Sequence, residues 1–126
     1  MPWPEVVRQV EEQLIDKGPC LYVIDTLGDW ALLGGEDENA SGAALQAMKP
    51  LQELASHGHA VLVLRHARKS GGGLGSGGRG SSAFSGAADI LVAMNPTIGQ
   101  GSENCRTLEA VGRLDAIPPR LTVEFD

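Results

Sequence analysis

Short, uninterrupted runs of apolar residues, each followed by polar residues, constrain the fold of this chain more than any other feature. Cys20–Ile24 is followed by Asp25, Ala60–Leu64 by Arg65, and Ile90–Met94 forms a third run of the same kind. Runs of roughly five residues without polar alternation are typical of strands buried on both faces of a parallel sheet. The sequence therefore predicts an α/β fold with a largely parallel sheet.

Two other segments have the residue spacing of helices. Apolar residues recur on one side of Glu5–Lys17, and a second helical pattern, capped by Asn39 or Ser41, runs to about His57. Pro50 lies inside the second pattern, which predicts a kink or a restart at that point. Because this helix connects Cys20–Ile24 to Ala60–Leu64, we expect a right-handed parallel crossover.

The C-terminal part of the chain has a different pattern, in which apolar and polar residues alternate. Thr107–Arg113 and Leu121–Phe125 show this alternation on either side of Pro118-Pro119. It predicts an antiparallel hairpin at the edge of a sheet. With 126 residues, of which 42% are apolar, the chain suffices for a single domain, residues 1–126.

Several features argue against a membrane or secreted protein. No stretch of the chain approaches the roughly 20 apolar residues that a membrane span needs, and no signal peptide opens it. Cys20 and Cys105 do not have the spacing of metal ligands, so we expect reduced thiols. These features predict a cytoplasmic protein.

Glycine and positive charge are concentrated in one window of the chain. Seven of the 17 glycines lie between Gly71 and Gly80. No acidic residue occurs between Glu53 and Asp89, and this window holds four Lys and Arg residues and all three histidines. The window predicts a flexible, basic loop over residues 68–80 that suits an anion such as phosphate or nucleic acid. A solvated surface loop is the alternative.

Polar side chains occupy the ends of the apolar runs, where the ligands of an open parallel sheet gather. Asp25, His66 and the stretch after Met94 lie at these ends. Four apolar residues followed by Asp25 have the form of a Walker B segment, whose aspartate helps to hold the Mg²⁺ of a nucleoside triphosphate. An aspartate that caps a turn is the alternative.

Several motifs follow one another in a specific order along the chain. They are Leu-Tyr-Val-Ile-Asp25-Thr-Leu, Asp37-Glu38-Asn39, Val-Leu-Val-Leu-Arg65-His66-Ala-Arg-Lys69, Arg79-Gly-Ser-Ser-Ala-Phe, Gly86-Ala-Ala-Asp89, and the closing segments Leu108–Arg113 and Leu121–Phe125. In order and spacing, this series over residues 5–126 resembles the RecA-like P-loop ATPases of the RepA replicative-helicase type. The resemblance implies a RecA-like fold with flanking helices and a role in DNA replication.

The resemblance implies a nucleotide site at the strand ends. Asp25 would act on Mg²⁺ through water, with Thr26 beside it at the nucleotide, and His66 would sense the γ-phosphate. Arg79 would be an arginine finger that reaches the nucleotide of a neighbouring subunit. From the residues alone, His66 can equally be a polar strand terminus, and Arg79 can pair with Asp89 or another acidic residue.

The resemblance also implies a contact with single-stranded DNA. Arg68, Lys69 and Arg79 would bind the nucleic acid, because residues 69–78 match the family's loop that faces the channel of a ring. A loop of this kind often adds aromatic side chains on which bases stack, and this window has none before Phe84. A bare glycine-rich linker is therefore the alternative.

One motif of the family does not occur in these residues. A phosphate-binding Walker A loop has the form Gly-x-x-x-x-Gly-Lys-Ser/Thr, and the 126 residues contain no such string. In the family, this loop and the catalytic glutamate lie upstream of the Walker B strand. We therefore expect the C-terminal half of a RecA-like domain, which is not an autonomous ATPase and takes ATP and Mg²⁺ only if the missing half is supplied.

Two other functions are compatible with the same motifs. One is an active ATPase half, completed by a Walker A-bearing partner or upstream segment. The other is a non-catalytic interaction or oligomerisation domain. Half of a sheet leaves an open edge and an apolar surface, so we expect a homo-oligomer or docking with a complementary half.

Overall fold

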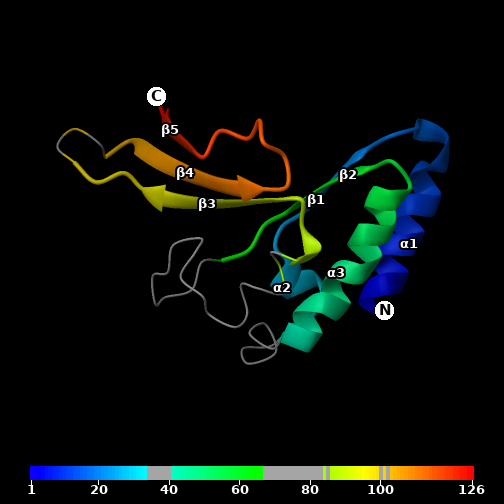
Figure 1. The fold of residues 1–126 in the computed structure, drawn as a ribbon. Helices are drawn as coiled ribbons and strands as arrows, with labels where there is room; N and C mark the ends of the chain where they lie inside the picture. Colours follow the sequence, from blue (N-terminus) through cyan, green and yellow to red (C-terminus); the bar gives the residue numbers. More distant parts are fainter. Residues whose placement is uncertain (34–40, 67–83, 85, 100, 102) are drawn as a thin grey trace.

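The computed structural model describes residues 1–33, 41–66, 84, 86–99, 101 and 103–126 (Figure 1). Helices and strands alternate in its first half, and strands follow one another in its second half. In chain order the elements are α1 (Trp3–Leu14), the 3-10 helix η1 (Ile15–Lys17), β1 (Leu21–Ile24), α2 (Leu27–Trp30), α3 (Ser41–Ser56), β2 (Ala60–Val63), β3 (Ile90–Pro96), β4 (Cys105–Gly112) and β5 (Arg120–Glu124).

Helix α1 is amphipathic and packs against α3 through its apolar side. Trp3 and Val7 are buried, and the indole N–H of Trp3 donates a hydrogen bond of 2.8 Å to the carbonyl oxygen of Ala47 in α3. Trp3 therefore buries its large apolar surface without leaving its polar atom unpaired. The helix predicted over Glu5–Lys17 is confirmed, although its last three residues form η1.

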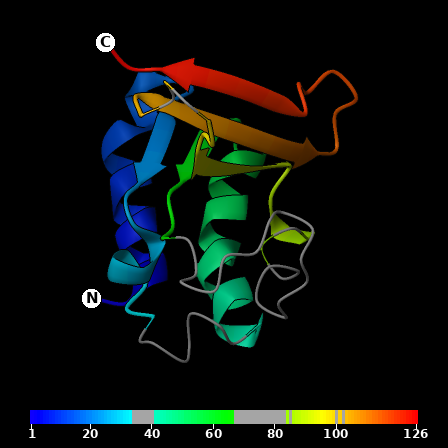
Figure 2. The same cartoon turned by 90° about the vertical axis from the view of Figure 1, so that its left-hand side faces the viewer.

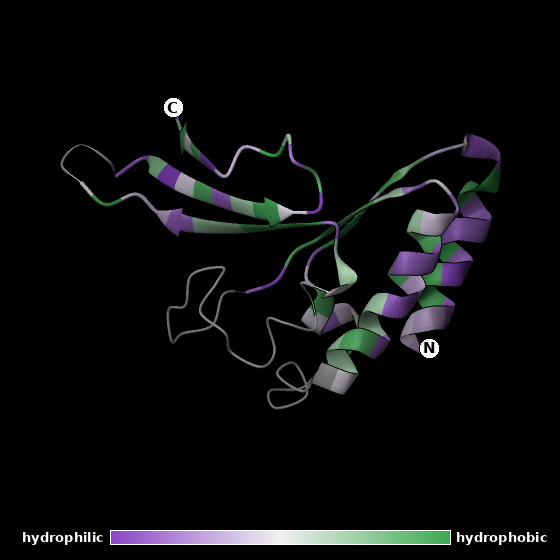
Figure 3. Cartoon of the chain, in the orientation of Figure 1, coloured by the Kyte–Doolittle hydropathy of each residue, from purple (hydrophilic) through white to green (hydrophobic). Residues whose placement is uncertain are grey.

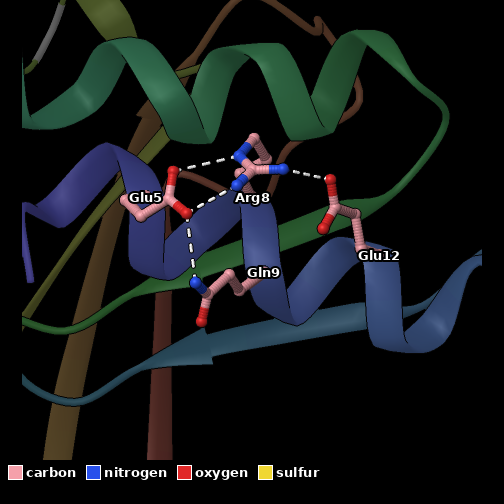
Figure 4. Close-up of polar contacts among 4 residues, drawn as sticks. All are labelled: Glu5, Arg8, Gln9 and Glu12. Carbon is pink, nitrogen blue, oxygen red and sulfur yellow. Dashed lines mark hydrogen bonds and ion pairs between the residues drawn. The ribbon is translucent and has the colours of Figure 1, made fainter.

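The solvent side of α1 carries a network of polar side chains (Figure 4). Arg8 donates hydrogen bonds to the carboxylates of Glu5 and Glu12, and Gln9 donates to Glu5 Oε1 at 3.0 Å. The bond from Arg8 lowers the pKa of Glu5 most, followed by the bond from Gln9. A lowered carboxyl pKa stabilises the folded state at neutral pH, and this contribution is lost as the pH falls. It is small here because solvent screens exposed pairs.

Strands β1 and β2 form the predicted parallel pair. Leu21 lies opposite Ala60, and Ile24 lies opposite Val63. Helices α1 and α3 both lie on one side of this pair (Figure 2). Tyr22 points to that side and is buried. The strand–helix–strand order read from the sequence is therefore confirmed.

The hydrophobic core lies between this face of the sheet and the two helices. Helix α3 is the largest contributor and runs unbroken through Pro50, so the helix does not restart there. Leu54 on its inner face is buried, whereas the neighbouring Ala55 is exposed. The core residues are Trp3, Val7, Tyr22, Leu27, Ala44, Ala47, Met48, Leu51, Leu54 and Phe84.

The opposite face of β1 and β2 is apolar and exposed, and both strands are coloured as hydrophobic in Figure 3. Leu21 is 64% exposed, Val23 52% and Leu62 48%, and Leu64 continues the row beyond β2 at 40%. The apolar runs predicted strands buried on both faces, and for these two strands that prediction is not met. The physical reason is that both described long helices, α1 and α3, pack on the other side. We refer to Leu21, Val23, Leu62 and Leu64 as the uncovered face.

Strands β3, β4 and β5 form a second, antiparallel sheet. The predicted C-terminal hairpin is confirmed by the pairing of β4 with β5, in which Leu108 lies opposite Leu121. Ile90–Met94, however, does not add a third parallel strand, because in the described structure β3 pairs antiparallel with β4 and not with β2. The chain is thus an α/β protein with two small sheets, which matches a single mostly parallel RecA-like sheet only loosely.

Gly112, at the end of β4, allows a close approach of two chain segments. A Cβ atom added at this position would lie 2.7 Å from the carbonyl oxygen of Asp89 and 3.3 Å from the Cα of Ile90. Because these are backbone atoms, Gly112→Ala should lower the free energy of unfolding by about 1–3 kcal/mol in urea denaturation. Gly42→Ala in α3 is the matched control, since the space around Gly42 is open, and it should be neutral or stabilising by up to about 1 kcal/mol. Equal effects of the two variants would contradict this packing.

Candidate functional site

The carboxyl ends of β1 and β2 lie at the same edge of the parallel pair. Asp25 directly follows β1 and is exposed, and His66, also exposed, lies three residues beyond Val63. The pairing continues past both strands, because Leu64 N–H donates to the carbonyl of Ile24 at 2.9 Å and Leu27 N–H donates to the carbonyl of Leu64 at 3.1 Å. The structure thus brings the two residues predicted from the strand ends to one edge.

Local hydrogen bonds hold the segment that carries Asp25. The hydroxyl of Thr26 donates to Asp29 Oδ2 at 2.7 Å, and the indole N–H of Trp30 donates to the carbonyl oxygen of Asp25 at 3.3 Å. These bonds tie the strand end to the short helix α2. Within the described parts of the chain, no hydrogen bond or ion pair engages the carboxylate of Asp25 itself. The carboxylate is therefore available to a ligand.

Arg65 separates β2 from His66 and packs against an aromatic ring. The guanidinium carbon of Arg65 lies 3.7 Å from the ring centroid of Phe84, which is within the range of a cation–π interaction. Phe84 is only 4% exposed and belongs to the core. The sequence did not indicate that Arg65 contacts Phe84, because the two residues lie 19 positions apart along the chain.

Three further site residues were predicted in the glycine-rich window. Arg68, Lys69 and Arg79, together with the glycine-rich loop 68–80, fall outside the described residues. Asp89, considered as a partner of Arg79, lies 3.6 Å from Arg113 NH1, and both side chains are well exposed.

The third polar strand end, after Met94, belongs to the antiparallel sheet and not to the edge that carries Asp25. It borders a pocket of about 250 Å³ whose polar lining includes Asn95, Thr107 and Glu109. Thr107 is buried, and its hydroxyl lies 2.9 Å from the hydroxyl of Thr97. Because β3 belongs to the antiparallel sheet, the stretch after Met94 does not share the edge that carries Asp25 and His66.

The chemistry of the edge suits Mg²⁺ in part. Mg²⁺ is commonly held by one or two carboxylates together with substrate phosphates and water, and Asp25 offers one free carboxylate. No three His, Cys, Asp or Glu side chains in the described ranges lie close enough together to hold a metal ion. No Gly-x-x-x-x-Gly-Lys-Ser/Thr string is present to cradle the phosphates. The edge therefore fits one contact of a nucleotide-bound Mg²⁺ and not a complete site.

A second polar cluster lies at the opposite ends of the strands. Nδ1 of His57 lies 2.6 Å from Glu11 Oε1, and Nε2 of His59 lies 3.6 Å from the same oxygen. Nδ1 of His59 accepts a hydrogen bond from the backbone N–H of Cys20 at 3.1 Å, which assigns the ring proton of the neutral form to Nε2. The cluster therefore joins α1 to the starts of β1 and β2.

Tyr22 is buried beside this cluster with its ring edge-on to His59. In the described structure its hydroxyl has no hydrogen-bond partner. Burial raises the pKa of Tyr22 most, and electrostatic repulsion from the nearby Cys20 and Glu11 side chains adds to the rise. The folded state therefore favours the neutral phenol, so its stability is intact below about pH 10 and declines as the pH rises above that value.

Removing this hydroxyl should stabilise the protein. Tyr22→Phe keeps the packing and deletes an unpaired polar group, so it should raise the free energy of unfolding by about 1 kcal/mol and reduce the loss of stability above about pH 10. Urea denaturation at neutral and alkaline pH measures both effects. Since Tyr22 is the single tyrosine, the absorbance of tyrosinate reports its titration directly. A tyrosinate transition at or below the ordinary value would contradict the burial.

Comparisons with known proteins bear on the first half of the chain. A family model described as an AAA domain matches residues 3–72, which include α1, β1, α3 and β2 and the edge with Asp25 and His66. No curated protein and no solved structure matches the chain. In the described ranges, no helix combines the length and the hydrophobicity that a membrane crossing requires. Since the match covers more than half of the chain and includes the edge that carries Asp25, the chain belongs to the AAA domain family and is an ATPase-like module.

Proposed function

We propose that this chain is a RecA-like, ATPase-derived module of the RepA replicative-helicase type, which responds to nucleotide and single-stranded DNA but does not hydrolyse ATP alone. The observation that carries this proposal is the position of two exposed polar residues, Asp25 and His66, at one edge of the parallel pair. A negative and a titratable side chain at the carboxyl ends of adjacent strands suit a triphosphate and its metal ion. The AAA domain match supports the coarser part of the proposal, an ATPase-like module.

Each residue at this edge has a proposed role. Asp25, with its free carboxylate, contacts nucleotide-bound Mg²⁺ through water, and Thr26 lies beside it. His66 hydrogen-bonds the γ-phosphate and passes its state to the segment that follows. When bound, ATP and Mg²⁺ supply the phosphoryl group and the cation that neutralises its charge. Arg79 is proposed to reach a neighbour's nucleotide as an arginine finger.

We propose that the chain does not hydrolyse ATP alone because these residues contain no Walker A string. Without backbone amides and a lysine around the β- and γ-phosphates, one carboxylate holds a nucleotide only weakly. Asp25 also follows the strand whose Leu21 and Val23 lie on the uncovered face. A segment that covered this face would come close to the same edge.

The DNA part of the proposal rests on Arg68, Lys69 and Arg79, which give a basic window in an acidic chain with a net charge of −6. Binding of a fluorescein-labelled oligothymidylate, measured by anisotropy, should weaken steeply with salt because phosphate contacts release counterions. Arg68→Gln with Lys69→Gln should weaken binding about tenfold or more and reduce the salt slope. Lys17→Gln, which lies outside the basic window, is the control and should have little effect. The absence of binding at low salt would refute the DNA role.

A second candidate function is favoured by the uncovered face. Four exposed apolar side chains on adjacent strands are unusual for an isolated domain and mark an interaction surface. We propose that this face mediates homo-oligomerisation or docks a complementary half. If that half carries a Walker A loop, the chain becomes one half of an active ATPase. If it does not, the chain is an interaction domain.

A further inference from the structure

An aromatic contact joins the residue after Leu64, just beyond the end of β2, to the described residues before β3. The guanidinium of Arg65 lies over the ring of Phe84 at 3.7 Å. Residues 67–83, which lie outside the described residues, connect His66 to Phe84 in the sequence. The contact thus joins the described residues before and after this 17-residue segment. It lies directly next to His66, the proposed phosphate sensor. We refer to Arg65 and Phe84 as the clasp.

Both partners of the clasp are themselves held in place. Ala88 N–H donates to the carbonyl oxygen of Phe84 at 3.0 Å, and Gln52 of α3 donates to the carbonyl oxygen of Ala87 at 3.1 Å. Phe84 is 4% exposed in the core. On the other side, Leu64 is bonded to both Ile24 and Leu27 through its backbone. Arg65 therefore links a fixed strand end to a fixed turn.

We infer that Arg65 is a positioning residue, whose contact with Phe84 fixes the backbone that carries His66 and joins it to the described residues before β3. His66 is the first residue beyond the clasp and is exposed, so burial of its own side chain does not fix its position. This inference rests on the proposed function for the role of His66. A cation–π contact needs both the charge and the ring face, which gives each partner a conservative and a disruptive substitution.

The test compares four variants of the full chain by NMR of the histidine imidazole groups. Arg65→Gln removes the charge, Phe84→Leu removes the ring, and Arg65→Lys keeps a cation over the ring. Arg106→Gln is the matched control, because Arg106 lies 5.9 Å from the ring centroid of Phe125 in the antiparallel sheet. The His66 resonances should move in Arg65→Gln and Phe84→Leu, and should stay near wild type in Arg65→Lys and Arg106→Gln.

A binding measurement with labelled oligothymidylate separates this inference from the proposed function. Arg65→Gln should weaken binding about 3- to 30-fold, which is the range that a cation–π contact supplies, and Arg65→Lys should restore most of it. If the wild-type chain binds no oligothymidylate, the DNA role fails and the His66 resonances still decide on the clasp. If Arg65→Gln leaves the His66 resonances unchanged, the clasp does not position His66 and the inference is overturned. Since Phe84→Leu can also loosen the core, the decision rests on the two substitutions of Arg65.

Discussion

Leu51→Ala will lower the free energy of unfolding by about 2–5 kcal/mol, because it removes a leucine that is only 2% exposed from the centre of the core. Leu51 lies on the face of α3 that packs against the rest of the core. The surrounding side chains can relax only partly into the space that the leucine leaves, so a cavity is expected to persist. Urea denaturation of the purified variant measures the change.

Leu21→Ala provides the matched control for this prediction. The same three carbon atoms are removed, but Leu21 is 64% exposed on the uncovered face, so under conditions where the chain is monomeric the change should stay within about 0.5 kcal/mol of wild type. If the two substitutions cost the same, the division into a packed face and an uncovered face of the β1–β2 pair is wrong.

Substitutions on the uncovered face should weaken association strongly and change the free energy of unfolding little. Leu21→Ser with Leu62→Ser replaces two exposed leucines on adjacent strands. If association buries these leucines, each contributes about 1.5–3 kcal/mol to the free energy of association. The double variant should therefore raise the dissociation constant at least ~100-fold. Size-exclusion chromatography with light scattering, repeated over a range of concentrations, measures the change in mass.

The control for association is Leu114→Ser, which replaces a leucine that is 62% exposed in the β4–β5 connection. It should leave the assembly of the wild-type chain intact. A wild-type chain that remains a 13.2 kDa monomer at all concentrations, alone and with candidate partners, would contradict the role proposed for the uncovered face.

The sequence was sufficient to predict the first half of the fold. The apolar runs before Asp25 and Arg65 predicted two strands, and the helical spacing between them predicted their parallel pairing. The strand ends predicted that Asp25 and His66 share an edge, since the ends of parallel strands coincide. These features depend on residues close together in the chain, which is why periodicity detects them.

The placement of β3 could not be predicted in the same way. Ile90–Met94 has the same apolar pattern as Ala60–Leu64, because such a run records only that its side chains can be buried and not which strand they pair with. The structure pairs β3 with β4 as part of an antiparallel sheet, with Ile90, Val92 and Met94 exposed. The pairing partner, and hence the split into two sheets, is a tertiary property.

Two long-range contacts could not be predicted from the sequence, one beside the candidate site and one at the opposite ends of the strands. The Arg65–Phe84 contact and the Glu11–His57 pair join residues that are distant in the chain. Neither forms a motif, because an arginine and a phenylalanine or a glutamate and a histidine occur together by chance in most sequences. Only the fold shows that Arg65 packs directly before His66.

ATP turnover by the purified chain, measured with Mg²⁺ and with or without oligothymidylate, decides whether the chain hydrolyses ATP alone. We expect turnover to stay at the level of the Asp25→Ala variant, because one carboxylate without a phosphate-binding loop cannot hold and activate the triphosphate. Turnover well above that level, lost in Asp25→Ala, would show that the chain is an autonomous ATPase and would refute the proposed function.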